Sequence, residues 1–196
     1  MPMHCFDRAE LPTMPWKNGG GVTREIACVP SGAGLEQFDW RVSIAHVTRD
    51  GPFSCFPGIE RVITLLDGAG MRLFGADERI DHRLDQVLTP WAFPGEALLQ
   101  CSLLGADCED FNVMTRRSRC RAQVQVLKSS QRLQRASGGV LLAFGGKVML
   151  EEPSGRRHLL APAQGLWWHD EPFEWELQIG SDAAVLLAAT IHSVNP

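Results

Sequence analysis

Three consecutive glycines set among charged and amide side chains mark residues 15–26 as a candidate binding segment. The stretch reads Pro-Trp-Lys-Asn-Gly-Gly-Gly-Val-Thr-Arg-Glu-Ile. Glycine lets a backbone turn sharply or approach a ligand closely, although it loses more entropy on folding than other residues. Lys17, Asn18 and Arg24 are therefore candidate ligand-binding residues. A flexible turn before the first strand is an equally good interpretation. A P-loop is excluded because its Gly-Lys-Ser/Thr ending is missing.

The alternation of side chains in residues 40–47 predicts a strand with two different faces. The face that we expect to pack as core between sheets carries Trp40, Val42, Ile44 and His46. The opposite face carries Arg41, Ser43, Ala45 and Val47. This second face would lie either in solvent or in the lumen of a barrel. In a lumen, Arg41 and Ser43 would be ligand-binding residues.

Arg61 and Asn112 are the other polar side chains set among apolar neighbours. An arginine in apolar surroundings usually has a carboxylate partner, from the protein or from a ligand. Asn112 could hydrogen-bond a small polar ligand or, equally, a neighbouring loop. Lys17, Arg41 and Arg61 together would form a cationic pocket for a small carboxylate, in a chain whose net charge is −4.

The histidines and cysteines show no spacing typical of a metal or catalytic site. The six histidines form no His-x-His pair, so His46, Glu60 and His82 could converge only through the fold. The sequence has no Gly-x-Ser-x-Gly motif. The six cysteines form no Cys-x-x-Cys pair and are expected to be reduced thiols, mostly in the core. We therefore expect no metal and no other cofactor.

The composition is that of an ordinary globular protein. Of the 196 residues, 44% are hydrophobic and 21% are charged, which suits one large domain or two small units. The negative net charge disfavours nucleic acid and anionic membranes as partners. No apolar run reaches the roughly 18 residues that span a bilayer, and the first residues lack the pattern of a signal peptide. We therefore expect a cytoplasmic protein.

Short strands separated by glycine, proline and aspartate turns dominate the chain, which predicts an all-β fold. The best helical candidate, residues 129–135, is short. Antiparallel sandwiches and barrels are built in this way. The clearest strands are expected at residues 40–47, 61–66, 71–74, 87–91, 97–104, 111–116, 122–128, 140–144, 146–151, 158–161, 166–169, 174–179 and 184–191.

A weak internal repeat divides the chain into two halves. Gly68 and Gly145 are separated by 77 positions, and so are Trp91 and Trp168. We therefore expect a duplicated β unit. Residues 1–118 would form an N-terminal strap and a first barrel, and residues 119–196 a second barrel-like half. Polar and glycine-rich segments lie mainly in the first half, which is predicted to be the half that bears the ligand.

Four blocks of the first half resemble the HutD/Ves family. They are residues 15–26, 38–45, 51–58 and 110–114, in that order along the chain. The resemblance implies an all-β, double-barrel (bicupin) jelly roll of antiparallel strands with an N-terminal extension. It also implies a link to histidine utilisation, with a regulatory or sensing role for an intermediate such as urocanate or formylglutamate. It favours the lumen for Arg41 and Ser43. Many cupins bind a metal through His-x-His, and this chain departs from that pattern, which argues against oxygenase chemistry.

Three functions are consistent with these features. The first is a metal-free bicupin that binds a small carboxylate of histidine degradation and regulates histidine utilisation without being an enzyme. The second is a cupin-type isomerase or hydrolase acting on such a metabolite, with Glu25, Glu60 or His46 as general base. The third is a protein–protein adaptor, in which Trp167 and Trp168 form a surface for a partner or for a homodimer.

Overall fold

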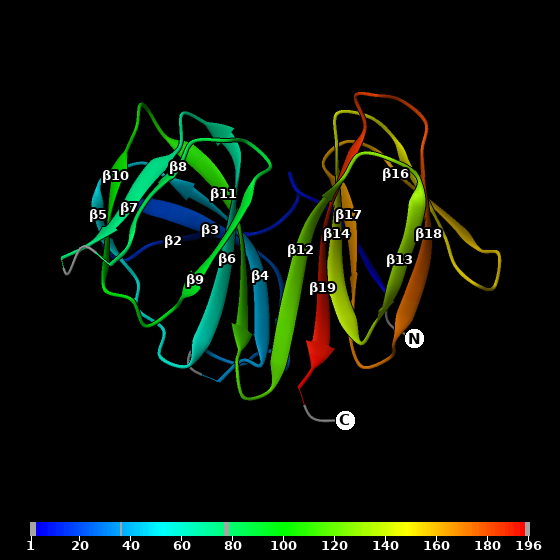
Figure 1. Cartoon of the computed structure of the whole chain (residues 1–196), viewed down its shortest axis with the longest axis horizontal. Coiled ribbons are helices and arrows are strands. Elements are labelled where there is room, and N and C mark those ends of the chain that lie inside the picture. Colours follow the sequence, from blue (N-terminus) through cyan, green and yellow to red (C-terminus); the bar gives the residue numbers. More distant parts are fainter. Residues whose placement is uncertain (1–2, 36, 77–78, 195–196) are drawn as a thin grey trace. The chain divides into compact units, whose positions relative to one another are not determined.

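A computed structural model describes residues 3–35, 37–76 and 79–194, and within these ranges the chain forms nineteen strands and no α-helix. No helix that could cross a membrane is therefore present among the described residues. The strands divide into two compact units (Figure 1). The first unit is Pro12–Cys120, and the second unit combines Met1–Leu11 with Arg121–Pro196. The prediction had assigned the whole N-terminal segment to the first half, but its first strand belongs to the second unit.

The first unit consists of two antiparallel sheets. Register pairing between strands distant in sequence, as between the strands that contain Trp40 and Thr115, is typical of a jelly roll rather than a meander. The six-stranded sheet has the order β2 (Thr13–Pro15), β3 (Gly21–Val29), β4 (Trp40–Val47), β11 (Cys108–Arg116), β6 (Ile59–Gly68), β9 (Pro90–Pro94). The four-stranded sheet has the order β5 (Gly51–Phe53), β10 (Leu99–Leu103), β7 (Met71–Gly75), β8 (Asp81–Leu84).

The core of the first unit lies between these two sheets. Val47 of β4 and Leu65 of β6 pack there with Leu73 and Leu99 of the smaller sheet. Because side chains alternate along a strand, Arg41, Ser43 and Ala45 share the inward face with Val47. The prediction of a lumenal face for Arg41 and Ser43 agrees with this arrangement.

The opposite face of β4 carries Trp40, Val42 and Ile44, which are also buried. The sequence had assigned this set to the core between the sheets, and that assignment is wrong. Both faces of the strand are buried, so apolar character alone did not identify the inward one. The inward face is the one with the polar side chains.

The second unit also consists of two antiparallel sheets. The segment that was the best, though short, helical candidate contains a strand instead, because β13 pairs with β18 and places Leu133 opposite Trp175 in the core. The five-stranded sheet has the order β1 (His4–Asp7), β17 (Gln164–Trp168), β14 (Gly138–Phe144), β19 (Val185–Ser193), β12 (Cys120–Leu127). The four-stranded sheet has the order β13 (Gln131–Ala136), β18 (Phe173–Ile179), β15 (Val148–Glu151), β16 (Arg157–Leu160).

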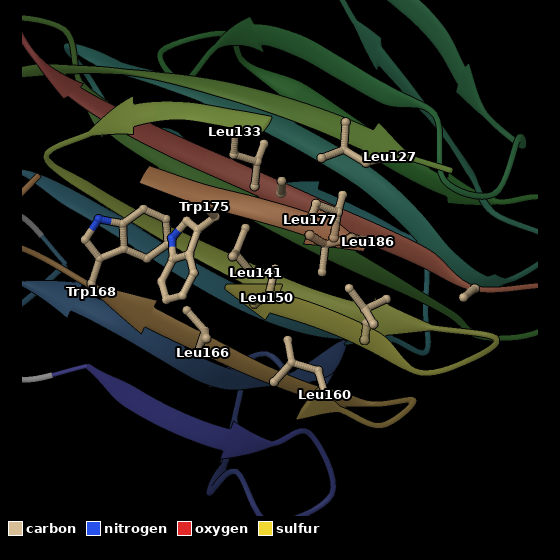
Figure 2. Packing of buried hydrophobic residues seen from close by; sticks show 14 of the residues in the cluster. Leu127, Leu133, Leu141, Leu150, Leu160, Leu166, Trp168, Trp175, Leu177 and Leu186 are labelled. Carbon is tan, nitrogen blue, oxygen red and sulfur yellow. The ribbon is translucent and has the colours of Figure 1, made fainter. Parts of the chain in front are cut away.

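Large apolar side chains fill the interior of the second unit. Figure 2 shows Trp168 and Trp175 together with a group of leucines from both of its sheets. The two indole rings meet edge to face, with centroids 5.9 Å apart, an arrangement that aromatic rings prefer. Trp168 also donates a hydrogen bond from Nε1 to the carbonyl of Ala136 at 3.1 Å. Trp168 is therefore a core residue.

The two units repeat the same strand arrangement. The large sheet of the first unit contains the strand order β9-β6-β11-β4, and the large sheet of the second unit contains the corresponding order β17-β14-β19-β12. The smaller sheets also correspond: Leu73 faces His82 in one, and Leu150 faces His158 in the other. This correspondence makes it possible to compare the interiors of the two units position by position.

Candidate ligand-binding site

Polar side chains gather on the inward face of the large sheet of the first unit, around its central strand β11. Asn112 of β11 lies directly opposite Ser43 on one neighbouring strand and Ile63 on the other. Two residues further along, Met114 lies opposite Arg41 and Arg61. Directly opposed residues point to the same side of a sheet. The fold therefore brings Arg41, Ser43, Arg61 and Asn112 together, four of the predicted site residues.

Arg61 is almost completely buried, with 4% of its surface exposed. Its Nε donates to Asn112 Oδ1 at 3.4 Å, and one terminal nitrogen donates to the carbonyl of Ser54 at 3.2 Å. The guanidinium carbon also lies 4.5 Å from the ring centroid of Phe53 and 5.1 Å from that of Phe93, so cation–π attraction contributes to holding it. Burial lowers the pKa of Arg61 to about 10, although the charge of Asp110 opposes this change. Arg61 is therefore a cation at neutral pH.

Arg41 is the second buried cation of the cluster. Its Nε donates to Glu25 Oε2 at 2.6 Å. Glu25 lies opposite Ser43 on strand β3, so the Arg41 guanidinium points along the sheet toward the row that Ser43 and Asn112 share. The Glu25 side chain keeps 35% of its surface exposed. The cluster therefore reaches solvent on the β3 side.

Asp110 belongs to the same face, and the sequence did not identify it as a site residue. It lies opposite Ala45 and Leu65, it is 1% exposed, and its Oδ2 has no hydrogen-bond partner among the described residues. Burial raises the pKa of Asp110 to about 7, against the opposing effect of Arg61. The available signal was its position two residues before Asn112, which puts both side chains on one face of a strand.

The glycine-rich segment that begins at residue 15 forms the hairpin between β2 and β3. The backbone nitrogen of Trp16 donates to the carbonyl of Gly21 at 2.9 Å, and Asn18 Oδ1 accepts from the nitrogen of Gly20 at 3.0 Å. A Cβ on Gly21 would lie 2.3 Å from the carbonyl oxygen of His46, so glycine is required there by close packing of two strands. Trp16 packs against the core between the sheets. The hairpin therefore closes one end of the unit.

Lys17, Asn18 and Arg24 do not join the buried cluster. Lys17 and Asn18 are exposed in the hairpin turn, and this turn precedes Gly21, which pairs with Val47. Arg41 is at the other end of β4, roughly 20 Å away along the strand. Arg24 lies opposite Ile44, on the other face of the sheet, and pairs with Glu109 at 3.3 Å. The predicted pocket of Lys17, Arg41 and Arg61 is therefore divided, and only the two arginines meet.

His46, Glu60 and His82 do not converge either. His46 lies 2.8 Å from Asp107, Glu60 pairs with Arg117 at 3.3 Å, and His82 stacks on Trp91 with ring centroids 4.0 Å apart. Within the described ranges, no three His, Cys, Asp or Glu side chains are placed so that they could share a metal ion.

The second unit has a cavity of about 360 Å³. His158 and Glu152 meet in it, with Nε2 and Oε1 2.7 Å apart. Trp167 lies elsewhere in this unit, stacked on His4 with ring centroids 4.2 Å apart. The cavity is lined by Met3, Cys5, Glu152, Arg156, His158 and Phe173. A buried arginine of the kind found in the first unit is not among these lining residues, so we place the candidate carboxylate site in the first unit.

Comparison with known proteins agrees with this architecture. A family model described as HutD matches residues 8–187. Protein Ves of Cronobacter sakazakii is 40% identical over 169 residues, which cover 86% of this chain and 88% of that protein. An uncharacterized 21.2 kDa protein in the hutC 3′ region of Pseudomonas putida is 43% identical over 150 residues, which cover 75% of this chain and 76% of that protein.

Solved structures show the same fold. HutD from Pseudomonas fluorescens SBW25 superposes with a TM-score of 0.81 at 30% identity, covering 98% of this chain and 99% of that one. A cupin 2 conserved barrel domain protein from Leptotrichia buccalis superposes with a TM-score of 0.60 at 9% identity, covering 95% of this chain and 96% of that one. The second similarity concerns the fold alone and identifies it as cupin-like.

Proposed function

Because this chain belongs to the HutD family, we propose that its first unit binds a small carboxylate metabolite of histidine degradation and thereby regulates histidine utilisation. One observation carries the proposal. Arg61 is buried on the inward face of the sheet, yet among the described residues no carboxylate forms an ion pair with it. A buried charge without an ionic partner is unfavourable. The charge of Asp110 acts on Arg61 without forming an ion pair with it, so a bound carboxylate would supply a direct partner.

The neighbours of Arg61 suit a small, flat carboxylate. Guanidinium groups bind carboxylates through paired hydrogen bonds, and the Arg41 guanidinium points toward the same row of the sheet. The rings of Phe53 and Phe93 surround the Arg61 head group. Urocanate and formylglutamate are both carboxylates, and a P. putida relative is described by its position in the hutC 3′ region. We therefore take these two metabolites as the first candidates.

A catalytic function is the second candidate, and Asp110 is the observation that favours it. A general base works best when its pKa lies near the operating pH, and burial raises the pKa of Asp110 to about 7. Glu60 and His46 are less suitable as bases, because both lie on the other face of the sheet. Incubating purified protein with urocanate or formylglutamate and following product formation distinguishes an isomerase or hydrolase from a binding protein.

Isothermal titration calorimetry tests the binding proposal. We expect urocanate or formylglutamate to bind, and Arg61→Lys to weaken the binding roughly 10- to 100-fold, because lysine keeps the charge but loses the planar fork. Arg24→Lys is the matched control on the opposite face and should leave the affinity unchanged. If the unmodified protein binds neither metabolite at millimolar concentration, the proposal is wrong.

A further inference from the structure

Asp110 is an anomaly in the interior of the first unit. Its side chain is almost inaccessible, and Oδ2 has no hydrogen-bond partner among the described residues. Buried polar atoms in proteins nearly always have a partner, and an unsatisfied one destabilises the fold by about 1–3 kcal/mol. A donor from a bound ligand would satisfy this atom.

The direction of the Asp110 side chain places it between the two sheets. It shares the inward face of β11 with Cys108, and its charge raises the pKa of Cys108 and of Cys101, which belongs to the smaller sheet, in addition to the larger effect of burial. The cationic neighbour is Arg61, whose pKa the Asp110 charge also raises. The carboxylate of Asp110 therefore faces the interior in which the arginines lie.

The spacing along the sheet separates this acceptor from the arginines by a short stretch of the inward face. The guanidinium of Arg61 reaches Asn112, and Asp110 lies two residues further along β11, roughly 7 Å away. Across this interval the adjacent strand β4 carries only the small side chains of Ser43 and Ala45. A molecule lying over these two residues would meet cations at one end and a free acceptor at the other.

We propose that Asp110 is a specificity-determining residue that accepts a hydrogen bond from the ligand, so that the site selects small carboxylates that also carry an N–H or O–H donor. The inference rests on the proposed function, since the arginines must hold the carboxylate end. The donor must lie roughly 5–7 Å from the carboxylate to span the interval between the Asn112 row and the Asp110 row. Urocanate has such a donor on its imidazole ring. A ligand of similar shape without the donor leaves Asp110 unsatisfied and is rejected.

A pair of nearly isosteric acids tests the inference. In 3-(2-furyl)acrylate the ring has no N–H group, because an oxygen and a C–H group stand where the imidazole ring has its two nitrogens, while the acrylate carboxylate is unchanged. Calorimetry with the full-length protein should show urocanate binding roughly 10- to 100-fold more tightly than the furyl acid, as expected for a hydrogen bond to a charged acceptor. Equal affinity of the two acids would overturn the inference while leaving the proposed function intact. Failure of both acids to bind would overturn the inference, and it would overturn the proposed function as well if formylglutamate also failed to bind.

Variants at position 110 test whether Asp110 causes the preference for urocanate over the furyl acid. Asp110→Leu removes the acceptor at similar size and should reduce the ratio of the two affinities to about one, mainly by weakening urocanate binding. Asp110→Asn retains one acceptor oxygen and should keep an intermediate ratio. Glu109→Gln is the matched control, because this neighbour faces the other side of the sheet, and it should keep the full ratio. If Asp110→Leu fails to fold, the comparison of the two acids on the unmodified protein still decides the question.

Discussion

The two units share one strand arrangement, but their interiors differ in polarity at equivalent positions of the large sheet. In the first unit, Arg61 lies opposite Phe93 on the inward face of the large sheet. In the second unit, the corresponding pair is Gly139 opposite Trp168, so the strand pairing matches Trp168 with Phe93 and not with Trp91, as the sequence repeat had suggested. A Cβ on Gly139 would lie 2.5 Å from the Trp168 ring, so the indole occupies the space that a side chain would need.

The same contrast extends along the central strands. Asn112 of β11 lies opposite Ile63, and its counterpart Ala188 of β19 lies opposite Leu141. Thus apolar side chains can fill the positions of the fold at which the first unit has buried polar ones, as the second unit shows. Buried charges are often replaceable by hydrophobic residues without loss of stability. The buried charges of the first unit are therefore not required by the fold itself.

The largest expected effect is a loss of stability when a large core side chain of the second unit is removed. Trp168→Ala should lower the free energy of unfolding by about 3–5 kcal/mol, because a large buried aromatic leaves a cavity. Chemical denaturation measures this change. Trp167→Ala is the control on the same strand, and it should have a smaller effect because Trp167 is only half-buried. Equal losses would contradict the assignment of Trp168 to the core.

An intermediate effect is expected from neutralising the buried charge of the first unit. Asp110 has a pKa of about 7 in the folded protein and an ordinary value of 3.8, so between these values the folded state binds more protons than the unfolded state. Its contribution to stability is therefore present below about pH 4 and is lost as the pH rises toward 7. Asp110→Asn should stabilise the protein at pH 8 by on the order of 2 kcal/mol and change little at pH 4.

Denaturation at several pH values checks this prediction. A variant that is less stable than the parent at pH 8 would show instead that Asp110 stabilises the fold through Arg61. The expected gain is typical of binding sites, where residues selected for function reduce stability.

The smallest effects are expected at predicted site residues that the fold places elsewhere. Lys17→Gln and Arg24→Gln should each change stability by less than about 1 kcal/mol, because one side chain is exposed and the other forms a partly exposed ion pair. Both should leave the affinity for urocanate unchanged in calorimetry. A tenfold loss in either variant would place the ligand outside the buried cluster.

The sequence could predict which site residues share one face of a strand, because side chains alternate between the two faces. Residues 40–47 form a strand with the expected bounds, and alternation grouped Arg41 with Ser43 correctly. The alternation of side chains does not reveal at which end of a sheet a turn lies. Lys17 was therefore grouped with Arg41 and Arg61, although its turn lies at the opposite end of the sheet. Alternation also placed Asp110 on the face of Asn112, but it does not reveal how deeply a side chain is buried or which partner it has.

The fold class was predictable because many short strands with turn residues suit few architectures, and the family resemblance agreed with it. Residues 129–135, which were not among the expected strands, show the limit of such a prediction. Residues such as Gln131 and Arg132 have no strong preference for strands. Their conformation is set by pairing with β18, which is a tertiary contact between segments about 45 residues apart.

A crystal structure of the protein with urocanate tests most directly whether Arg61 binds the ligand. We expect the ligand carboxylate to lie within hydrogen-bond distance of the Arg61 guanidinium, on the inward face of the large sheet of the first unit. Ligand density in the cavity beside His158 of the second unit, with the Arg61 region unchanged, would contradict it.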